Sequence, residues 1–257
     1  MPSIEQNKTQ WTHYEWSERG DEWSQVWGGT AYLWWGALYP RLMRFLPAGV
    51  ILEIAPGFGR ITRYLKDQCR RLVVVDLTER CIEACRARFR DERHISYHVN
   101  DGRSLAMVAD ASVDFAISFD SLVHADPDVL RAYLAELARK LTPAGVAFLH
   151  HSNLGAFRDA ETGQLPFPNQ HWRSETMSAE LFREMCAESG LRCASQEIVN
   201  WGGAELHDCF SVFVRDPAPS GKPCDVRENP NFMTEAFGLG AVSRQYQGGA
   251  GEKPPQG

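Results

Sequence analysis

Four histidines follow predicted strands in the middle of the chain. His124 comes shortly after one predicted strand, His150 and His151 end the next, and His171 lies in the loop beyond it. Histidine is the side chain best suited to take or give a proton near neutral pH. Because side chains alternate along a strand, His150 and His151 should face opposite sides of the sheet. Each histidine alone also fits a structural role, but together they indicate proton transfer, with His124 as the first candidate base and His151 as the second.

Asp120 ends the predicted strand 113–119, four residues before His124. Three roles fit this carboxylate: it orients a histidine, it bonds a substrate, or it binds a divalent metal with His124 or His151. A carboxylate-type metal site uses several neighbouring acids, and the sequence around Asp120 has no such cluster. We therefore expect no metal in the site.

A glycine turn must bring a ligand to these side chains. Apolar residues 50–54 predict a buried strand, and Gly57 and Gly59 follow it. Ile61 and Leu65 then lie at helical spacing, so a helix should begin near Gly59. Glycine has no Cβ, so a nucleotide-like ligand can approach the backbone N–H groups of this turn closely.

Polar residues also end the next two predicted strands. Strand 72–75 ends at Asp76, about 20 residues beyond the glycine turn, where a ribose-binding acid belongs. Strand 95–99 ends at Asp101 and Gly102. In an open α/β sheet, ligands bind at the carboxyl ends of the strands. These residues therefore predict a binding site at one edge of a sheet.

The pattern resembles the class I S-adenosylmethionine-dependent methyltransferases. Residues 53–59 match the first motif of that family, with Ala55 where the first glycine is usual. Asp76 matches the acid that holds the ribose hydroxyls, and Asp101 matches the acid near the adenine amino group. Residues 119–120 match the fourth motif, where cofactor and substrate meet. The resemblance is specific for fold and cofactor and does not define the acceptor.

The resemblance covers residues 50 to 215 and implies an α/β fold. This is a Rossmann-like, seven-stranded, mostly parallel sheet with a C-terminal antiparallel hairpin formed by strands near 193–201 and 208–215. It also implies S-adenosyl-L-methionine as cofactor and S-adenosyl-L-homocysteine as product. The cofactor residues that it implies are Glu53, Ala55, Gly57, Gly59, Arg60, Asp76, Leu77, Asp101, Gly102 and Phe119.

For the reaction we expect O-methylation of a small polar acceptor, such as a sugar or another secondary metabolite. An alcohol is a poor nucleophile until a base removes its proton, which is the role that His124 or His151 would fill. Methylation of nitrogen or of a carboxyl group without a strong base is one alternative. A non-catalytic S-adenosylmethionine-binding partner subunit is another. The Ala55-Pro56 turn and Asp101 argue against a third, an NAD-dependent oxidoreductase.

Composition narrows the partners. The chain has 257 residues, a net charge of −6, 44% apolar and 23% charged residues. That balance is ordinary for a soluble globular protein and gives no overall attraction to nucleic acid. Seven cysteines without a C-x-x-C pair indicate reduced thiols, and no signal peptide or membrane span is evident. We expect a cytoplasmic protein with a small-molecule acceptor, and the oligomeric state stays open.

Outside the central domain, 47–216, we expect an N-terminal helical cap, 1–46, and a tail, 217–257. The first ten residues should be mobile. Six of the eight tryptophans lie in the cap, and Trp16, Trp23 and Trp27 have the spacing of one helical stripe. These rings either anchor the cap or line a pocket, where they would suit a sugar ring or a sulfonium.

Two further segments lack a clear pattern. Residues 154–175 have no periodicity, and a long irregular loop of this kind is often a lid or a binding loop. Its Trp172 and Arg173 either contact the substrate or pack within the loop. In the tail, residues 231–237 can pack on the central domain, and the last ten residues should be disordered.

Overall fold

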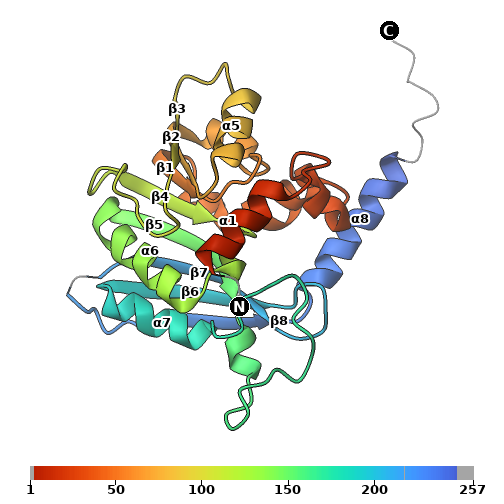
Figure 1. The fold of residues 1–257 in the computed structure, drawn as a ribbon, viewed down its shortest axis with the longest axis vertical. Helices are drawn as coiled ribbons and strands as arrows, with labels where there is room; N and C mark the ends of the chain where they lie inside the picture. The colour runs from red at the N-terminus through yellow and green to blue at the C-terminus, as the bar shows by residue number, and fades with distance from the viewer. Residues whose placement is uncertain (1–2, 217, 248–257) are drawn as a thin grey trace.

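The computed structural model describes residues 3–216 and 218–247. Their strands form one sheet of eight strands in the order β3-β2-β1-β4-β5-β7-β6-β8 (Figure 1). The bounds are β1 Ala48–Ile54, β2 Cys69–Asp76, β3 Ile95–Val99, β4 Val113–Ser118, β5 Leu141–Ser152, β6 Leu191–Val199, β7 Asp208–Arg215 and β8 Asp225–Asn229. The α/β class and the mostly parallel sheet that the sequence predicted are confirmed.

The first five strands pair in parallel, and β7 runs antiparallel between β5 and β6. The predicted antiparallel hairpin is therefore present. The predicted number of seven strands is wrong, because β8 pairs in parallel with β6 at the edge. All but the last of its side chains are exposed, so main-chain bonds hold this strand and no apolar pattern marked it.

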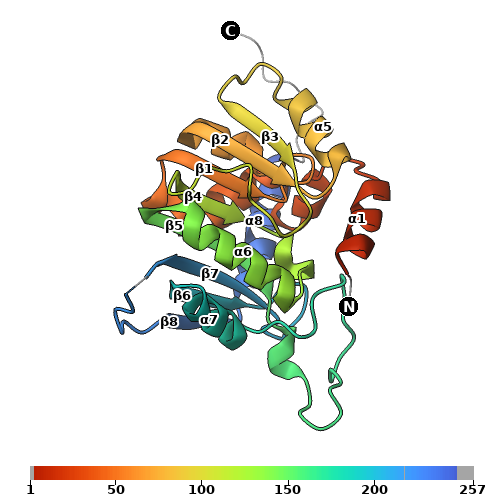
Figure 2. The ribbon, with the colours of Figure 1, turned by 60° about the vertical axis from the view of Figure 1, so that its left-hand side comes forward.

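Helices cover both faces of the sheet (Figure 2). Helices α6 and α7 pack on one face, and the N-terminal segment and α8 lie on the other. The bounds are α1 Ile4–His13, α2 Thr30–Tyr32, α3 Tyr39–Leu42, α4 Thr62–Leu65, α5 Glu79–Arg88, α6 Pro127–Lys140, α7 Ala179–Glu188 and α8 Phe232–Gln247.

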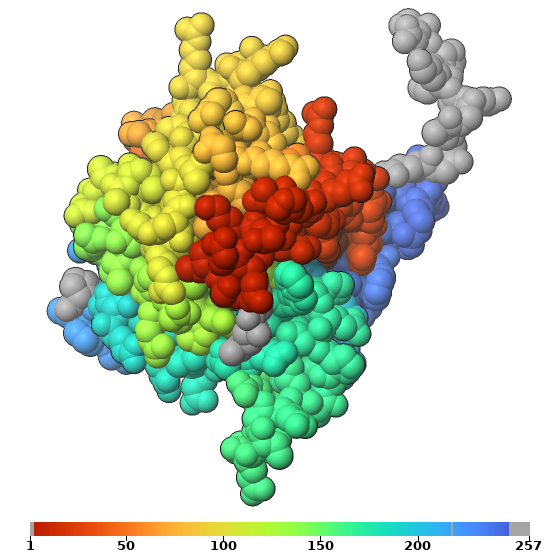
Figure 3. Space-filling model, viewed as in Figure 1, coloured from red at the N-terminus to blue at the C-terminus, as the bar shows by residue number. Residues whose placement is uncertain are grey.

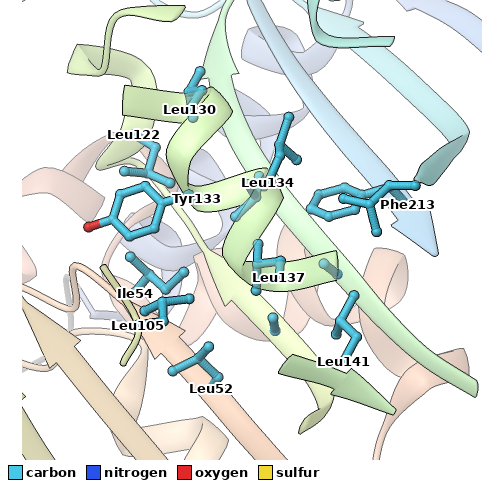
Figure 4. Close-up of a cluster of buried hydrophobic side chains, with 14 of the residues drawn as sticks. Leu52, Ile54, Leu105, Leu122, Leu130, Tyr133, Leu134, Leu137, Leu141 and Phe213 are labelled. Carbon is cyan, nitrogen blue, oxygen red and sulfur yellow. The ribbon is translucent and has the colours of Figure 1, made fainter. Parts of the chain in front are cut away.

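Burial on both faces explains the continuous apolar runs of the central strands. In β1, Leu52 and Ile54 point toward α6, whereas Ile51, just before Leu52, packs on the other face. Figure 4 shows Leu134 and Leu137 of α6 in the same buried cluster as Leu52 and Ile54. Strands that are buried on both faces read as unbroken apolar stretches, which is typical of parallel sheets. This packing fixes the strand ends that carry the site.

The N-terminal segment differs from its prediction. Residues 4–13 form α1, whose start is capped reciprocally by Ser3 and Gln6. The expectation that the first ten residues are mobile is therefore wrong for Ile4 to Gln10. The prediction that Trp16, Trp23 and Trp27 lie on one helical stripe is also wrong. The chain turns at Arg19 and Gly20, both with positive φ. A 3₁₀ helix, Asp21–Trp27, follows the turn, so Trp16 is not on a common helix with the later tryptophans.

The C-terminal helix packs on this N-terminal segment. Ser243 of α8 donates to the Gly28 carbonyl at 2.9 Å, and Phe232 contacts Trp27 with ring centroids 6.0 Å apart. The sequence suggested that residues 231–237 pack on the body, and most of them form the first part of the longer helix α8. Residues 248–257, for which disorder was expected, lie outside the described residues. The division into cap, central domain and tail stays a prediction.

Candidate active site

A cavity of about 570 Å³ lies at the carboxyl ends of β1, β2 and β4, beneath the N-terminal segment. Figure 3 shows this segment in red beside the green loop around residues 154–175, and residues of both line the cavity. Its volume is in the range of natural small-molecule sites. The cavity wall includes most of the predicted cofactor residues: Glu53, Ala55, Gly57, Arg60, Asp76, Leu77, Gly102 and Phe119.

The turn after β1 has left-handed backbone at Ala55, Gly57 and Gly59, with φ of 56°, 58° and 82°. A positive φ is uncommon for alanine, so the structure itself explains why glycine is usual at position 55. A Cβ on Gly57 would lie 2.8 Å from the ring of Trp16, at the cavity wall. At Gly59 it would lie 2.6 Å from Phe89 instead, so Gly59 serves helix packing and does not line the cavity.

Two buried carboxylates stand behind this turn. Asp76 accepts bonds from the backbone N–H of Thr78 at 2.8 Å and, through its other oxygen, from Gly57 at 3.4 Å. Glu53 accepts a bond from the hydroxyl of Thr62 at 2.6 Å. Burial raises the pKa of Asp76 to about 6 and that of Glu53 to about 7. Both side chains are therefore poised to respond to a polar ligand in the cavity.

Asp101 lies elsewhere. Its side chain is exposed and accepts the backbone N–H groups of Arg103 and Ser104 at 2.9 and 2.7 Å. These bonds lower the pKa of Asp101 and stabilise a turn. The cavity wall includes its neighbour Gly102 but not Asp101. The adenine contact assigned to Asp101 stays a prediction.

Asp120 lines the cavity and pairs with Arg60. The Arg60 guanidinium donates to Asp120 Oδ2 at 2.7 Å and to the hydroxyl of Ser24 at 3.3 Å. Its Cζ lies 5.8 Å from the ring centre of Phe119. Asp120 also has a positive φ of 58°. Arg60 thus connects the glycine turn, the end of β4 and the N-terminal segment around the cavity.

His124 is the predicted base that reaches the cavity. Its Nδ1 donates to the Trp172 carbonyl at 3.0 Å, and its ring centre lies 5.3 Å from that of Trp11. Since a carbonyl only accepts, Nδ1 carries the hydrogen and Nε2 of the neutral ring carries the lone pair. Burial lowers the pKa of His124 below its ordinary value, so the ring is neutral near pH 7.

The histidine pair at the end of β5 faces opposite sides, as predicted. His151 is fully buried on the α7 side, where its Nε2 bonds the hydroxyl of Ser211 at 2.8 Å and its ring stacks on Phe182. Burial lowers the pKa of His151 to about 4. It does not line the cavity, so the structure does not support His151 as a second base. His171 does line the cavity.

His150 belongs to a buried network that the sequence analysis missed. Its Nε2 lies 3.2 Å from Asp208 Oδ2, and Asp208 receives two bonds from Arg173 at 2.7 and 2.8 Å. Arg173 forms this ion pair and also lines the cavity, so substrate contact by Arg173 stays a prediction. Asp208 begins β7, 35 residues beyond Arg173, so no local spacing could have revealed the pair.

The aromatic residues of the N-terminal segment fill both roles that the sequence left open. Trp11, Tyr14, Trp16 and Trp23 line the cavity, and neighbouring rings in this group lie 5.1 to 6.5 Å apart. Trp34 is fully buried and anchors the segment to the sheet. The cavity wall formed by the N-terminal segment is therefore largely aromatic, and Trp16 of this group packs against the glycine turn.

Two searches of the described residues complete the site. In the ranges 3–216 and 218–247, no three histidines, cysteines or acids are grouped so that they could hold a metal ion. None of the described helices has the length and apolar content that crossing a membrane requires. All seven cysteines are free thiols.

The sheet order and a cavity at its carboxyl edge define a Rossmann-like α/β protein with a small-molecule site. Residues 51–145 match a family model described as a methyltransferase domain. The PH0226 protein of Pyrococcus horikoshii OT3 has a similar structure, with a TM-score of 0.55 and 23% identity over 70% of this chain and 88% of that one. An S-adenosylmethionine-dependent methyltransferase from Mesorhizobium loti aligns with a TM-score of 0.55 and 19% identity over 71% of this chain and 100% of its own.

Two curated proteins are similar in sequence. Nodulation protein S of Rhizobium tropici is 27% identical over 175 residues, which are 68% of this chain and 66% of that protein. The rRNA adenine N-6-methyltransferase of Streptomyces fradiae is 36% identical over 66 residues, 26% of this chain and 21% of that protein. This chain thus spans just under two thirds of the first protein's length and about a fifth of the second's.

Residues 51–145 are thus similar to methyltransferase domains, and the fold is that of solved S-adenosylmethionine-dependent methyltransferases. The family implies S-adenosylmethionine as cofactor. The residues present fit that group. The cavity has room for it, the glycine turn and the Asp76 carboxylate both line that cavity, and Asp76 stands at the tip of the neighbouring strand.

Proposed function

We propose that this enzyme methylates a hydroxyl group of a small polar acceptor, such as a sugar or another secondary metabolite, with His124 as general base. The observation that carries this proposal is the state of the His124 ring. Its Nδ1–H is held by the Trp172 carbonyl, its pKa is lowered by burial, and it lines the cavity. A neutral, oriented imidazole is the group that an alcohol needs for loss of its proton.

In this mechanism the bound cofactor supplies an electrophilic methyl group on its sulfonium. Asp76 and the turn at Gly57 would hold the cofactor, Asp76 by accepting hydrogen bonds from its ribose hydroxyls. Asp120, held by Arg60, orients the acceptor beside His124. Nε2 of His124 would take the hydroxyl proton as the acceptor oxygen bonds to the methyl carbon, and the electron pair of the broken sulfur–carbon bond would stay with sulfur in S-adenosylhomocysteine. Most of the protein's contribution is orientation, which is the main demand of an in-line displacement.

The aromatic wall supports a carbohydrate-like or otherwise flat acceptor. Trp11, Tyr14 and Trp23 line the cavity from the N-terminal segment, and Trp11 makes edge-type ring contacts with the other two. Trp172, half exposed, does so from the opposite loop. Aromatic rings of this kind combine large contact areas with few side-chain torsions. His171 lies next to Trp172 and is a second polar contact on that side.

The test is a transfer assay with S-adenosylmethionine labelled in its methyl group and a panel of sugars and other alcohols. His124→Ala should lower kcat about 100-fold or more, as expected for loss of a general base. Its affinity for S-adenosylhomocysteine should stay within twofold of the wild type. His98→Ala, on the edge strand β3 and outside the cavity wall, is the matched control. A wild-type kcat in His124→Ala would exclude the proposed base.

N-methylation is a second candidate. The match to the rRNA adenine N-6-methyltransferase, limited as it is to 66 residues, favours a nitrogen acceptor. A nitrogen with its own lone pair needs orientation more than a base. In that case kcat should not depend on pH through the histidine range, and His124→Ala should keep most of its rate. The O-methylation proposal requires the opposite on both counts.

We also propose that the reaction needs no metal and that the protein acts in the cytoplasm on a small molecule rather than on nucleic acid. The sequence around Asp120, with no cluster of neighbouring acids, favours metal independence. The free thiols favour a reducing compartment. Full activity after dialysis against a chelator is the result expected. Activity that is lost on dialysis and restored by Mg²⁺ would contradict metal independence.

A further inference from the structure

We propose that His150 is a positioning residue, which together with Asp208 and Arg173 fixes the backbone of Asp120 at the acceptor side of the cavity. His150 and Asp208 have no exposed surface, and Arg173 is 3% exposed. Histidine, aspartate and arginine are seldom fully buried unless they pair. The inference rests on the proposed function only in giving Asp120 a role toward the acceptor.

Hydrogen bonding defines the tautomer of His150. The backbone N–H of Asp120 donates to Nδ1 at 3.1 Å, so Nδ1 carries no hydrogen. The ring hydrogen must then be on Nε2, which faces Asp208 Oδ2 at 3.2 Å. Phe119, Trp201 and Phe210 surround the ring with centroids 4.8 to 5.4 Å away. His150 thus accepts one hydrogen bond through Nδ1, and its Nε2, which has no hydrogen bond of good geometry, has the Asp208 carboxylate as its ionic neighbour.

Asp208 keeps that tautomer in place. Both of its oxygens accept bonds from Arg173, at 2.7 and 2.8 Å. Burial alone would raise the pKa of Asp208, but the Arg173 guanidinium and His150 hold it well below its usual range. An ionised carboxylate can only accept hydrogen bonds, so it favours the tautomer in which the facing Nε2 of His150 carries the hydrogen. It therefore fixes Nε2–H and leaves Nδ1 free for Asp120.

The Asp120 backbone needs such a partner. Its φ of 58° is left-handed, which is uncommon for a residue other than glycine. Such backbone persists where surrounding groups over-determine it, and it is frequent at functional sites. Here the side chain is held by Arg60 and the N–H by His150. Removal of His150 Nδ1 should therefore loosen the backbone turn at Asp120, which orients the Asp120 carboxylate.

The same network reaches His124 from the other side. Arg173 is held by Asp208, and the residue before it, Trp172, accepts the Nδ1–H of His124. The N–H of Ser174, the residue after Arg173, donates to the Val123 carbonyl at 2.9 Å. One buried cluster therefore fixes both groups that the proposed reaction uses, the carboxylate of Asp120 and the ring of His124.

The first experiment measures the tautomer by nitrogen-15 NMR of labelled histidines. Wild-type His150 should be protonated on Nε2. In Asp208→Asn the amide N–H of the new side chain can face Nε2, which should move the ring hydrogen to Nδ1, against the Asp120 amide. A wild-type ring that is protonated on Nδ1 would contradict the proposal.

The second experiment needs no folded Asp208 variant. Hydrogen exchange of the Asp120 amide is compared in His150→Phe, His150→Asn and the matched control His151→Phe. His151 is the neighbouring residue, equally buried but on the other face. Exchange should be about tenfold faster in His150→Phe, which has no acceptor there. It should stay near wild type in His150→Asn, whose side-chain oxygen takes the place of Nδ1, and in His151→Phe.

Equal exchange in His150→Phe and the wild type, or an equal increase in His151→Phe, would overturn the proposal. In the transfer assay, kcat should fall about tenfold in His150→Phe while affinity for S-adenosylhomocysteine stays within twofold. A parallel loss of cofactor affinity would indicate general damage and also overturn it. If no panel alcohol is methylated, the proposed O-methylation fails, but NMR and exchange still decide the role of His150.

Discussion

The two sides of the cavity are built in different ways. On one side, a turn of β1 and the tip of β2 supply Glu53, Gly57 and Asp76, which come from adjacent parallel strands. On the other side, the wall combines the N-terminal segment, the loop with His171 and Trp172, and Met233 of α8. The first side is set by backbone conformation at strand ends. The second depends on packing between segments from both ends of the chain.

This difference indicates that cofactor binding and acceptor specificity depend on different parts of the molecule. The glycine turn follows a buried strand of a sheet whose overall fold is shared with the similar solved structures. The aromatic wall rests on α8, which packs against the N-terminal segment through Gly240 and Ser243. Loops and caps on a rigid scaffold are the regions that carry specificity. The cofactor side should therefore tolerate few changes, and the acceptor side more.

The largest expected effect is on the cofactor side. Asp76→Asn should weaken binding of S-adenosylhomocysteine about 100-fold, because a charge-assisted hydrogen bond contributes roughly 1.5–3 kcal/mol and the ribose would make two. Calorimetric titration measures this loss. Asp101→Asn is the matched comparison, since its carboxylate is exposed and caps a turn. An equal loss in both would mean that Asp101 also contacts the cofactor.

Protonation provides a second way to test the cofactor side. Folded-state pKa values near 7 for Glu53 and near 6 for Asp76 lie above the ordinary values. Between the unfolded and folded pKa values, the folded protein binds more protons than the unfolded chain. The stability from each group is present at low pH and is lost as pH rises through its folded pKa, by no more than about 3 kcal/mol each.

The measurement is the free energy of unfolding of ligand-free wild type minus that of Glu53→Gln, at pH 5 and pH 8. The difference should be smaller at pH 8, which separates this effect from that of the histidines. Affinity for S-adenosylhomocysteine should have the opposite trend and weaken below about pH 6, where Asp76 takes up a proton. A pH-independent difference would mean that the pKa of Glu53 is not raised in the folded protein.

On the acceptor side, α8 can be loosened by a single methyl group. A Cβ on Gly240 would lie 2.3 Å from the Val26 carbonyl oxygen, so Gly240→Ala should destabilise the protein by about 1–3 kcal/mol. Gly238 on the same helix has nothing within 4 Å of its Cβ position, so Gly238→Ala should stabilise by up to about 1 kcal/mol. Thermal unfolding measures both. Equal effects would mean that α8 does not support the aromatic wall.

The smallest expected effect is at the rim of the cavity. Trp172→Ala should raise KM for a hydroxyl acceptor by roughly threefold to tenfold, because an exposed ring contributes about 1 kcal/mol of contact. Trp172 is 50% exposed, so the unfolding temperature should not change measurably. Its backbone carbonyl, which holds His124, is kept in the variant. A change in cofactor affinity would mean that Trp172 belongs to the cofactor side of the cavity and not to the acceptor side.

Much of the cofactor side could be read from the sequence. The apolar run before Gly57, the acid at Asp76 and the spacing between them define local elements whose relative positions a parallel sheet fixes. His124 could be proposed because it follows a strand end. The eighth strand, α1 and the role of Asp101 could not be read in this way. Edge strands and capped polar helices carry little apolar periodicity, and an acid after a glycine-rich strand end fits more than one role.

The sequence by itself determined the mostly parallel part of the sheet, the glycine turn and the resemblance to methyltransferases, since these follow from residues that interact within strand-turn-helix units. Only the tertiary structure decided which histidine reaches the cavity and which is buried. It also paired Arg173 with Asp208 and placed α8 against Trp27. The physical reason is distance along the chain. Periodicity records which face a residue takes, but a contact between distant segments depends on how whole elements pack.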